Sequence, residues 1–351
     1  MTEFLENYWY VAGLDSMMPP VSRRVVLGHP IVLFRTSDGQ VSALEDWCPH
    51  RGVPLSLGEV VEDALQCPYH GLSFDRNGTC VKNPHVKGTP DALKARSIPC
   101  RLRQGTIWVW IGDPDLVDEG RVPVYADFEP EAGFEVVEGY LNIKAGYRLL
   151  IDNLLDLSHA EFIHSKSLGT PNAAASVSTR AVSREDGVTV ERRARDVLPS
   201  PLFKPVWGKS ERVDQVSDMS WAVPSSLSMD IFVTFPDGAR EDGLCMPMLH
   251  LLTPETDGTT HYHWRLGRNF NLGDGAYSAR LVTTVTNAFV DEDAPVIEAI
   301  QRNLDCFGSK RPLANFTVGD AGSRRARKMI QDRLLVQEAA RGIAEPLAAS
   351  V

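Results

Sequence analysis

The 351-residue chain is long enough for two domains that each bury a core. Hydrophobic residues make up 43 % of it and charged residues 23 %, and the net charge is −10, which disfavours nucleic acid as a partner because a phosphate backbone binds basic surfaces. The six cysteines are too few for a disulfide framework. No apolar run approaches the roughly 18 residues of a membrane span, and the N-terminus lacks a signal peptide's basic start. We therefore expect a cytoplasmic protein that spans no membrane.

Residues 1–118 are expected to form an all-β domain of short strands. Apolar runs at residues 25–27, 31–34 and 41–44 are separated by turn residues, which is the pattern of strands joined in hairpins. Residues 107–111, with two tryptophans, are expected to form a further buried strand. Such a domain presents loops at one end, where they can hold a bound group.

Two loops of this domain pair cysteine with histidine. Cys48-Pro49-His50 is followed, after sixteen residues, by Cys67-Pro68-Tyr69-His70. Zinc would accept these residue types, but zinc sites usually pair cysteine with cysteine and histidine with histidine. One thiol and one imidazole from each loop suit a Rieske [2Fe–2S] cluster, in which two thiolates hold one iron and two imidazoles the other. The pattern predicts such a cluster, with zinc or two purely structural loops as the alternatives.

The segment from Pro114 to Pro130 is rich in aspartate, glutamate and proline, and we place the domain boundary within it, between residues 118 and 119. The second domain, residues 119–351, mixes helical and strand patterns, so the chain is of the α+β class. Its expected elements are a strand at 139–144, a helix at 147–162, several strands within 175–270, one or two helices within 281–304 interrupted near Pro295, and an amphipathic helix at 323–341.

A second group of polar residues lies in the expected helix at 147–162 and just after it. Asn153, Asp156 and His159 recur at every third position in an otherwise apolar stretch, and His164 follows. Any one of them alone would fit a polar helix face, but two histidines with one carboxylate form the facial triad of non-haem Fe(II) oxygenases. Residues five apart in a straight helix point roughly 140° from each other. His159 and His164 can therefore share a metal only if the helix bends, bulges or ends between them, and we predict that it does.

The carboxylate of this triad has to come from elsewhere in the chain. The best candidate region is Asp291-Glu292-Asp293, just before Pro295 in an otherwise apolar helix. Composition does not choose among the three acids, and a solvated acidic helix start would have the same sequence.

These motifs resemble the terminal oxygenase component of the Rieske non-haem iron oxygenases, and more narrowly the vanillate O-demethylase and dicamba monooxygenase group. The resemblance extends over nearly the whole chain. It is carried by Asn7-Tyr8-Trp9-Tyr10-Val11-Ala12, by Cys48-Pro49-His50-Arg51-Gly52-Val53-Pro54-Leu55-Ser56, by Cys67-Pro68-Tyr69-His70-Gly71-Leu72, by Asp152-Asn153-Leu154-Leu155-Asp156-Leu157-Ser158-His159 and by Leu252-Thr253-Pro254-Glu255-Thr256.

The resemblance implies a fold and a ligand set. The second domain would have the helix-grip (START-like) fold, a curved antiparallel sheet wrapped around a long helix. The cluster ligands would be Cys48, His50, Cys67 and His70, and the iron ligands would be His159, His164 and Asp293. Asp156 would carry electrons from a cluster histidine to an iron-binding histidine across a subunit interface, in a head-to-tail ring that is commonly a homotrimer.

Three more residues are assigned with their alternatives. A carboxylate at Asp156 that accepts N–H bonds from two metal-bound imidazoles would fix both tautomers and couple the two sites. The alternative, a helical carboxylate on the surface, is disfavoured because Leu155 and Leu157 flank it. Asn153 is expected either near the iron or in helix packing. His250 aligns with a position that contacts an aromatic acid in relatives, and a strand histidine with a local hydrogen-bond partner is the alternative.

The resemblance implies a monooxygenase that uses O2 and removes the methyl group of a vanillate-like methoxylated aromatic acid as formaldehyde. Electrons would come from NAD(P)H through a separate reductase with a flavin and a ferredoxin-type iron–sulfur centre. An alternative reaction is hydroxylation of an aryl methyl group or another aromatic substituent. A Rieske electron-transfer protein without its own catalysis is the alternative from another class, and it is disfavoured because a carrier has no use for the second metal site.

Overall fold

The computed structural model describes residues 4–88, 93–164, 177–208, 212–308 and 319–348. The chain divides into two compact units, one made of Phe4–Val124 with Thr253–Thr256, and the other made of the described residues in Tyr125–Leu252 and from Asp257 onward. The change of unit after Val124 lies six residues beyond the boundary expected after residue 118. The sequence did not indicate that residues 253–256 belong to the first unit.

The N-terminal unit consists of β-strands and short 3-10 turns. Three antiparallel sheets run in the orders β1-β11-β10, β2-β3-β4-β9 and β5-β6-β7-β8, and the large side chains of Trp108 and Trp110 are almost completely buried. The strands are β1 (Tyr8–Leu14), β2 (Val21–Val26), β3 (His29–Arg35), β4 (Val41–Glu45), β5 (Glu59–Val61), β6 (Ala64–Gln66), β7 (Ser73–Phe74), β8 (Cys80–Lys82), β9 (Ser97–Ile98), β10 (Cys100–Arg103) and β11 (Thr106–Ile111). The expectation of an all-β first domain is confirmed.

Hydrogen bonds explain why residues 253–256 join this unit. The amides of Leu27 and Gly28 donate to the carbonyl oxygens of Pro254 and Glu255 at 2.8 and 2.9 Å. The buried hydroxyl of Thr253 donates to the carbonyl oxygen of Val11 at 2.7 Å. These partners are more than 200 positions apart in the chain, so a local sequence pattern does not reveal them.

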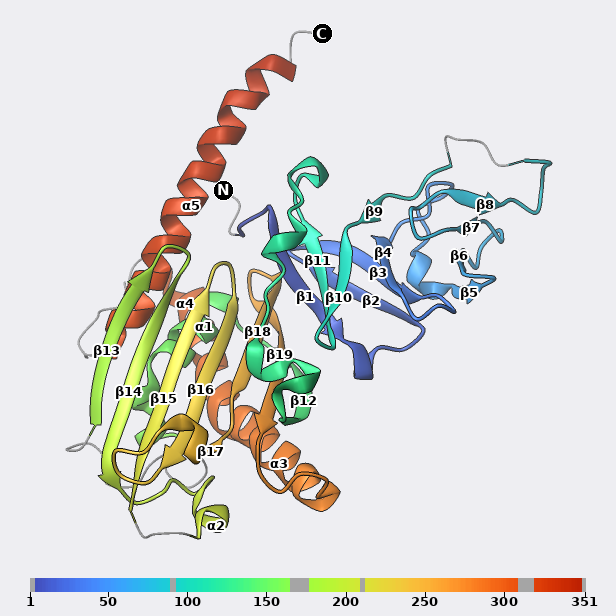
Figure 1. Cartoon of the computed structure of the whole chain (residues 1–351). Coiled ribbons are helices and arrows are strands. Elements are labelled where there is room, and N and C mark those ends of the chain that lie inside the picture. Colours follow the sequence, from blue (N-terminus) through green and yellow to red (C-terminus); the bar gives the residue numbers. More distant parts are fainter. Residues whose placement is uncertain (1–3, 89–92, 165–176, 209–211, 309–318, 349–351) are drawn as a thin grey trace. The chain divides into compact units, whose positions relative to one another are not determined.

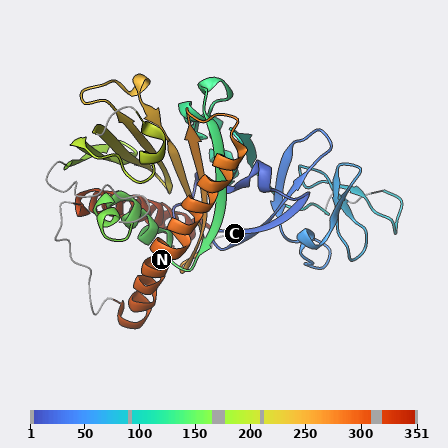
Figure 2. The same cartoon turned by 90° about the horizontal axis from the view of Figure 1, so that it is seen from below.

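The second unit is built on one antiparallel sheet with the order β12-β19-β18-β16-β15-β14-β13, and β17 pairs with β16. Its strands are β12 (Glu135–Ile143), β13 (Val177–Arg184), β14 (Gly187–Val197), β15 (Val213–Ala222), β16 (Ser226–Thr234), β17 (Leu244–Cys245), β18 (Met248–Thr256) and β19 (Thr259–Arg268). In β15 every second side chain is buried, from Val213 to Trp221, because alternate residues of a strand face opposite sides of the sheet. Figures 1 and 2 show helices on one face of this curved sheet.

The helices of the second unit are α1 (Tyr147–Leu155), α2 (Lys204–Trp207), α3 (Gly275–Asn287), α4 (Ala294–Phe307) and α5 (Asp320–Ala348). Some of their bounds differ from the sequence-based expectation: α2 was not expected, α3 begins before residue 281, and α5 extends beyond residues 323–341 at both ends. The helix expected at 147–162 ends at Leu155, and the interruption expected near Pro295 is a π-helical turn, Ala288–Asp293, just before it. The α+β class, with an antiparallel sheet and helices in the second domain, is confirmed. Among the helices that the structure describes, none combines the length and apolar character needed to cross a bilayer.

One glycine of the sheet is predicted to be essential for packing. Gly139 in β12 pairs with Trp264 in β19, and a Cβ at position 139 would lie 2.5 Å from atoms of the fully buried indole. Gly139→Ala should therefore lower the free energy of unfolding by about 1–3 kcal/mol, as overpacking does in a close-packed core. A fall in the midpoint of thermal unfolding would report the loss.

Gly275→Ala is the matched control, since a Cβ there meets nothing within 4 Å and alanine is the better helix former. Equal midpoints for the two variants would contradict the packing assigned to Trp264.

Candidate metal centres and substrate pocket

The two cysteine–histidine loops have the same backbone hydrogen-bond pattern. In each, the amide of the cysteine donates to the carbonyl oxygen five positions later, and the amide of the glycine four positions later donates back to the carbonyl oxygen of the cysteine. The pairs are Cys48–Val53 at 2.9 Å and Gly52–Cys48 at 2.8 Å in one loop, and Cys67–Leu72 at 2.8 Å and Gly71–Cys67 at 3.0 Å in the other. Gly52 and Gly71 have φ values of +70° and +71°, which favour glycine.

These loops bring the four predicted cluster ligands together. The two thiols are buried, and the two imidazoles lie nearer the surface. Cys48 and Cys67 are each only 1 % exposed, whereas His50 is exposed and its ring centroid lies 4.6 Å from that of His70. Burial, together with the neighbouring Cys67 thiol, raises the pKa of Cys48 to about 11. Two buried thiols become thiolates when a metal compensates their charge. The donor set therefore fits a cluster with one thiolate-held and one imidazole-held iron.

His85 adds a contact to this site that the sequence did not indicate. Its Nε2 lies 2.9 Å from the carbonyl oxygen of His70. The imidazole thereby supports the second loop at the main chain of a predicted ligand.

The second candidate metal site depends on the end of α1. Asp156 leaves the helical conformation with φ −105° and ψ 82° and begins a 3-10 helix, Leu157–Glu161. The helical path ends before His164, and the rings of His159 and His164 approach each other with centroids 5.1 Å apart. The prediction that the helix bends or ends between the two histidines is confirmed.

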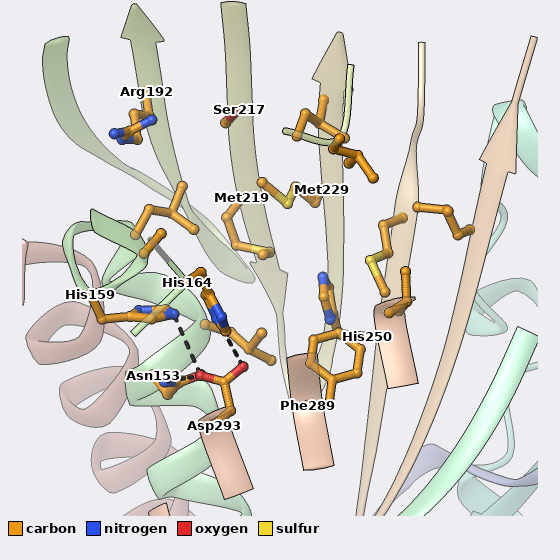
Figure 3. Close-up of a pocket in the computed structure, with 18 of the residues that line it drawn as sticks. Asn153, His159, His164, Arg192, Ser217, Met219, Met229, His250, Phe289 and Asp293 are labelled. Carbon is orange, nitrogen blue, oxygen red and sulfur yellow. Dashed lines mark hydrogen bonds and ion pairs between the residues drawn. The ribbon is translucent and has the colours of Figure 1, made fainter. Parts of the chain in front are cut away.

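The π-helical turn assigns a different place to each acid of Asp291-Glu292-Asp293. Asp293 is buried and points at both histidines (Figure 3): its Oδ1 lies 3.7 Å from Nε2 of His159 and its Oδ2 lies 3.1 Å from Nε2 of His164. Glu292 accepts a hydrogen bond from Nδ1 of His164 at 2.6 Å, and Asp291 is exposed. The structure thus brings His159, His164 and Asp293 together as a candidate metal site.

The hydrogen bonds of the two histidines leave their Nε2 atoms for a metal. Nδ1 of His159 lies 2.5 Å from the carbonyl oxygen of Asp156 and donates to it. Burial lowers the pKa of His164, but the hydrogen bonds and charges of Asp293 and Glu292 outweigh burial and raise it. The site therefore attracts positive charge. Hydrogen bonds from Nδ1 to a carbonyl oxygen or a carboxylate are also typical of metal-binding histidines.

Asn153 and Asp156 also take definite places. The amide of Asn153 donates to Oδ1 of Asp293 at 3.3 Å, so it supports the acid of the candidate metal site. Asp156 contacts His159 through its main-chain oxygen rather than through its carboxylate, because that carboxylate accepts hydrogen bonds from the amide and hydroxyl of Ser158 at 3.0 and 2.6 Å. The same carboxylate packs against the backbone at Gly319, where a Cβ would overlap it unless the Asp156 side chain moved.

A mostly apolar pocket opens between the candidate metal site and the sheet. Its lining includes Met219, Met229, Met248 and Phe289 together with the three candidate ligands. His250 also lines it, and Nδ1 of His250 lies 2.6 Å from the hydroxyl of Tyr262. Burial lowers the pKa of His250 to about 3, so this imidazole is neutral at physiological pH. Its buried Nε2 has no hydrogen-bond partner among the described residues.

Sequence reasoning missed several residues of the site. The sequence left Glu292 as one of three candidates for the iron ligand. Its contact with Nδ1 of His164 depends on the π-helical turn, which the sequence did not indicate. Gly52 and Gly319 give no signal apart from being glycines. The inward-facing polar residues of β14 and β15 could have been noticed as breaks in the apolar alternation of these strands.

Comparisons with known proteins show which families and structures the chain is similar to. The Rieske [2Fe-2S] domain family matches residues 8–99, and the vanillate O-demethylase oxygenase C-terminal domain family matches residues 143–335. The oxygenase component of chloroacetanilide N-alkylformylase from Rhizorhabdus wittichii is 36 % identical over 99 % of both chains. The oxygenase component of dicamba O-demethylase from Stenotrophomonas maltophilia is 37 % identical over 85 % of this chain and 88 % of its own. A crystal structure of dicamba monooxygenase with non-heme iron and dicamba has a TM-score of 0.86 and 34 % identity, and covers 97 % of this chain and 99 % of its own.

The contact between Glu292 and His164 leads to a prediction about metal affinity. Glu292→Gln keeps the shape of the side chain but removes the charge that fixes the ring and raises the basicity of His164. The affinity for the mononuclear iron should fall by about 10-fold or more, as is usual when the partner of a ligand histidine is lost. Iron content after dialysis against a graded chelator would measure it.

Asp291→Asn is the matched control, because it removes an equal charge from an exposed neighbouring position. If both variants retain iron equally well, Glu292 has no role in orienting His164.

Proposed function

This chain belongs to the Rieske non-haem iron oxygenases, in the group of the vanillate and dicamba O-demethylase oxygenase components, and we propose that it O-demethylates a methoxylated, vanillate-like aromatic acid. It is the terminal oxygenase component of such a system. In the proposed reaction one oxygen atom of O2 enters the methyl C–H bond and the other leaves as water, with two electrons and two protons consumed. The hemiacetal formed breaks down to a phenol and formaldehyde.

The observation that carries this proposal is the pocket that ends at His159, His164 and Asp293. The apolar side chains in its middle suit an aromatic ring, and one of its polar ends lies at the candidate iron ligands (Figure 3). An electron carrier has no use for such a pocket. The alternative of a Rieske protein without its own catalysis is therefore set aside.

The protein uses a [2Fe–2S] cluster and a mononuclear iron, and the described residues offer a donor set for each. We propose Cys48, His50, Cys67 and His70 as the cluster ligands and His159, His164 and Asp293 as the iron ligands. When bound, these groups supply electron relay and activation of O2.

The chain's own residues position the substrate and exclude water. Asn153 and Glu292 hold the acid and one imidazole of the iron site in place through their hydrogen bonds. Neutral His250 presents Nε2 to the pocket, and because Tyr262 is held in the core its hydrogen bond to Nδ1 fixes the imidazole ring. We propose that His250 contacts the ring substituent of the substrate by one hydrogen bond.

Asp156 is proposed as the electron link between the two metal sites. Its main-chain oxygen binds Nδ1 of His159, and its half-buried carboxylate is available to accept a hydrogen bond from an imidazole of another subunit. This role requires a head-to-tail ring of subunits, and we propose a homotrimer. We further propose that electrons come from NAD(P)H through a separate reductase with a flavin and a ferredoxin-type iron–sulfur centre.

Two other reactions would use the same site. Hydroxylation of an aryl methyl group needs the same oxidant and pocket. A reaction on a chloroacetanilide is supported by the relative from Rhizorhabdus wittichii, the oxygenase component of a chloroacetanilide N-alkylformylase, which matches 99 % of the chain. The substrates separate these reactions: a methoxylated acid for O-demethylation, a methyl-substituted aromatic for methyl hydroxylation, and a neutral chloroacetanilide for the reaction of that relative.

Formaldehyde release tests the proposed reaction. The purified protein, a compatible reductase and NADH are given a panel of methoxybenzoates that includes vanillate, alongside methylbenzoates and N-alkoxyalkyl anilides. We expect one formaldehyde for each O2 consumed with at least one methoxybenzoate. O-demethylation would be overturned if the oxygen consumed with every methoxybenzoate appeared only as peroxide, while a substrate of another class gave product.

The electron link predicts a specific phenotype for Asp156→Asn. Both metals should stay bound, because Asp156 is not a proposed ligand, while turnover coupled to NADH should fall by about 100-fold or more, as for loss of a residue that acts only in the reaction. Metal analysis, the cluster spectrum and formaldehyde assays would be measured on the same preparation. A variant that turns over at the parental rate would refute the electron link.

A further inference from the structure

One arginine faces the interior of the second unit. In β14, Val188, Val190 and Ala194 are core residues on the inner side of the sheet, and Arg192 occupies the same inner side with only 6 % of its surface exposed. An arginine in such a row is costly because a buried charge has to be compensated. Arg192 also lines the pocket that ends at the candidate iron site.

Two further polar side chains stand beside Arg192. Val190 pairs with Met219 and Arg193 with Val216, so the register places Arg192 opposite Ser217 in β15. Gln215 follows on the same inner face of β15, and its buried Oε1 has no hydrogen-bond partner among the described residues. Arg192, Gln215 and Ser217 all line the pocket.

This polar group lies away from the candidate iron site. Figure 3 shows Arg192 and Ser217 on the strands at one side of the pocket, the triad of His159, His164 and Asp293 at the other, and Met219 between them. A substrate whose acidic group is held at Arg192 therefore directs its opposite end toward the triad. The apolar stretch between the two polar ends suits an aromatic ring.

The charge of Arg192 is only partly compensated in this structure. Its one side-chain partner within the described residues is Glu161, at 3.3 Å from Nη2 to Oε1. The guanidinium side chain is 7 % exposed, whereas the Glu161 side chain is 27 % exposed and can turn into solvent. Among the described residues that line the pocket, Arg192 is also the sole lysine or arginine. Neutral His250 cannot supply a charge.

We propose that Arg192, with Gln215 and Ser217, binds the carboxylate or sulfonate of an aromatic acid, and that Glu161 occupies this anion position until the substrate displaces it. Guanidinium groups bind such oxyanions through paired N–H donors. The inference rests on the proposed function for the reaction but names the residue that selects acids over neutral aromatics. The inference also predicts that a neutral anilide is a poor substrate, because an uncharged molecule would not displace Glu161 from Arg192.

Equilibrium binding without turnover tests this site. The metal-loaded protein, without reductase, is titrated calorimetrically with 4-methoxybenzoate, 4-methoxybenzenesulfonate and 4-methoxybenzamide. We expect the parent to prefer one or both acids over the amide. Arg192→Met should raise the Kd of the preferred acid by about 10- to 100-fold and change that of the amide by less than about 3-fold. Arg192→Lys should restore part of the loss.

Two further variants make the test specific. Arg195→Met removes an equal charge from an exposed position of the same strand and should leave all three Kd values unchanged. Glu161→Gln removes the competing anion and should tighten acid binding, whereas a merely structural Glu161 would give weaker or unchanged binding. Iron content and the cluster spectrum are recorded for each variant to establish that both metal sites are intact.

The outcomes separate this inference from the proposed reaction. Equal weakening of acid and amide in Arg192→Met, or no preference for acids in the parent, would overturn the anion site. If the preference is lost in Arg192→Met but no methoxylated acid yields formaldehyde, the anion site stands and O-demethylation fails. If Arg192→Met demethylates an acid with the parental KM, the anion site fails and the proposed reaction stands.

Discussion

The candidate iron site depends on three side chains reaching one point from two irregular segments of backbone. His159 and His164 converge because α1 ends at Leu155 and a 3-10 helix follows. Asp293 reaches them because a π-helical turn separates α3 from α4. A regular helix at either place would point these groups apart, so the chemistry of the site rests on two local departures from regular helix geometry.

Charge organises the surroundings of that point. Asp293 and Glu292 make the position of His164 attractive to a cation, and the amide of Asn153 supports Asp293. The positively charged Arg192 lies at the other side of the pocket, beyond its apolar side chains, and Glu161 partly neutralises this charge. A pocket with the acidic side chain of a candidate metal site at one end and a buried guanidinium at the other suits an amphipathic aromatic molecule.

The sequence alone was enough to predict the features that depend on residues only a few positions apart. The two loops with Cys48, His50, Cys67 and His70 indicated a Rieske cluster because each loop contributes one thiol and one imidazole. Alternating apolar residues and turn signals indicated the all-β first domain, and the need for His159 and His164 to share a metal predicted the end of the helix between them. These inferences hold because they depend on residues close together in the chain.

The tertiary structure was needed for every feature that depends on contacts between segments far apart in the chain. It placed Asp293 beside Nε2 of both histidines and Glu292 at Nδ1 of His164, since the direction of each side chain depends on a π-helical turn that composition does not reveal. It assigned residues 253–256 to the first unit through hydrogen bonds to Val11, Leu27 and Gly28. It also placed Arg192 opposite Ser217, because strand register is set by pairing across the sheet. The sequence by itself thus determined the kinds of metal site, whereas long-range packing determined which side chains surround them.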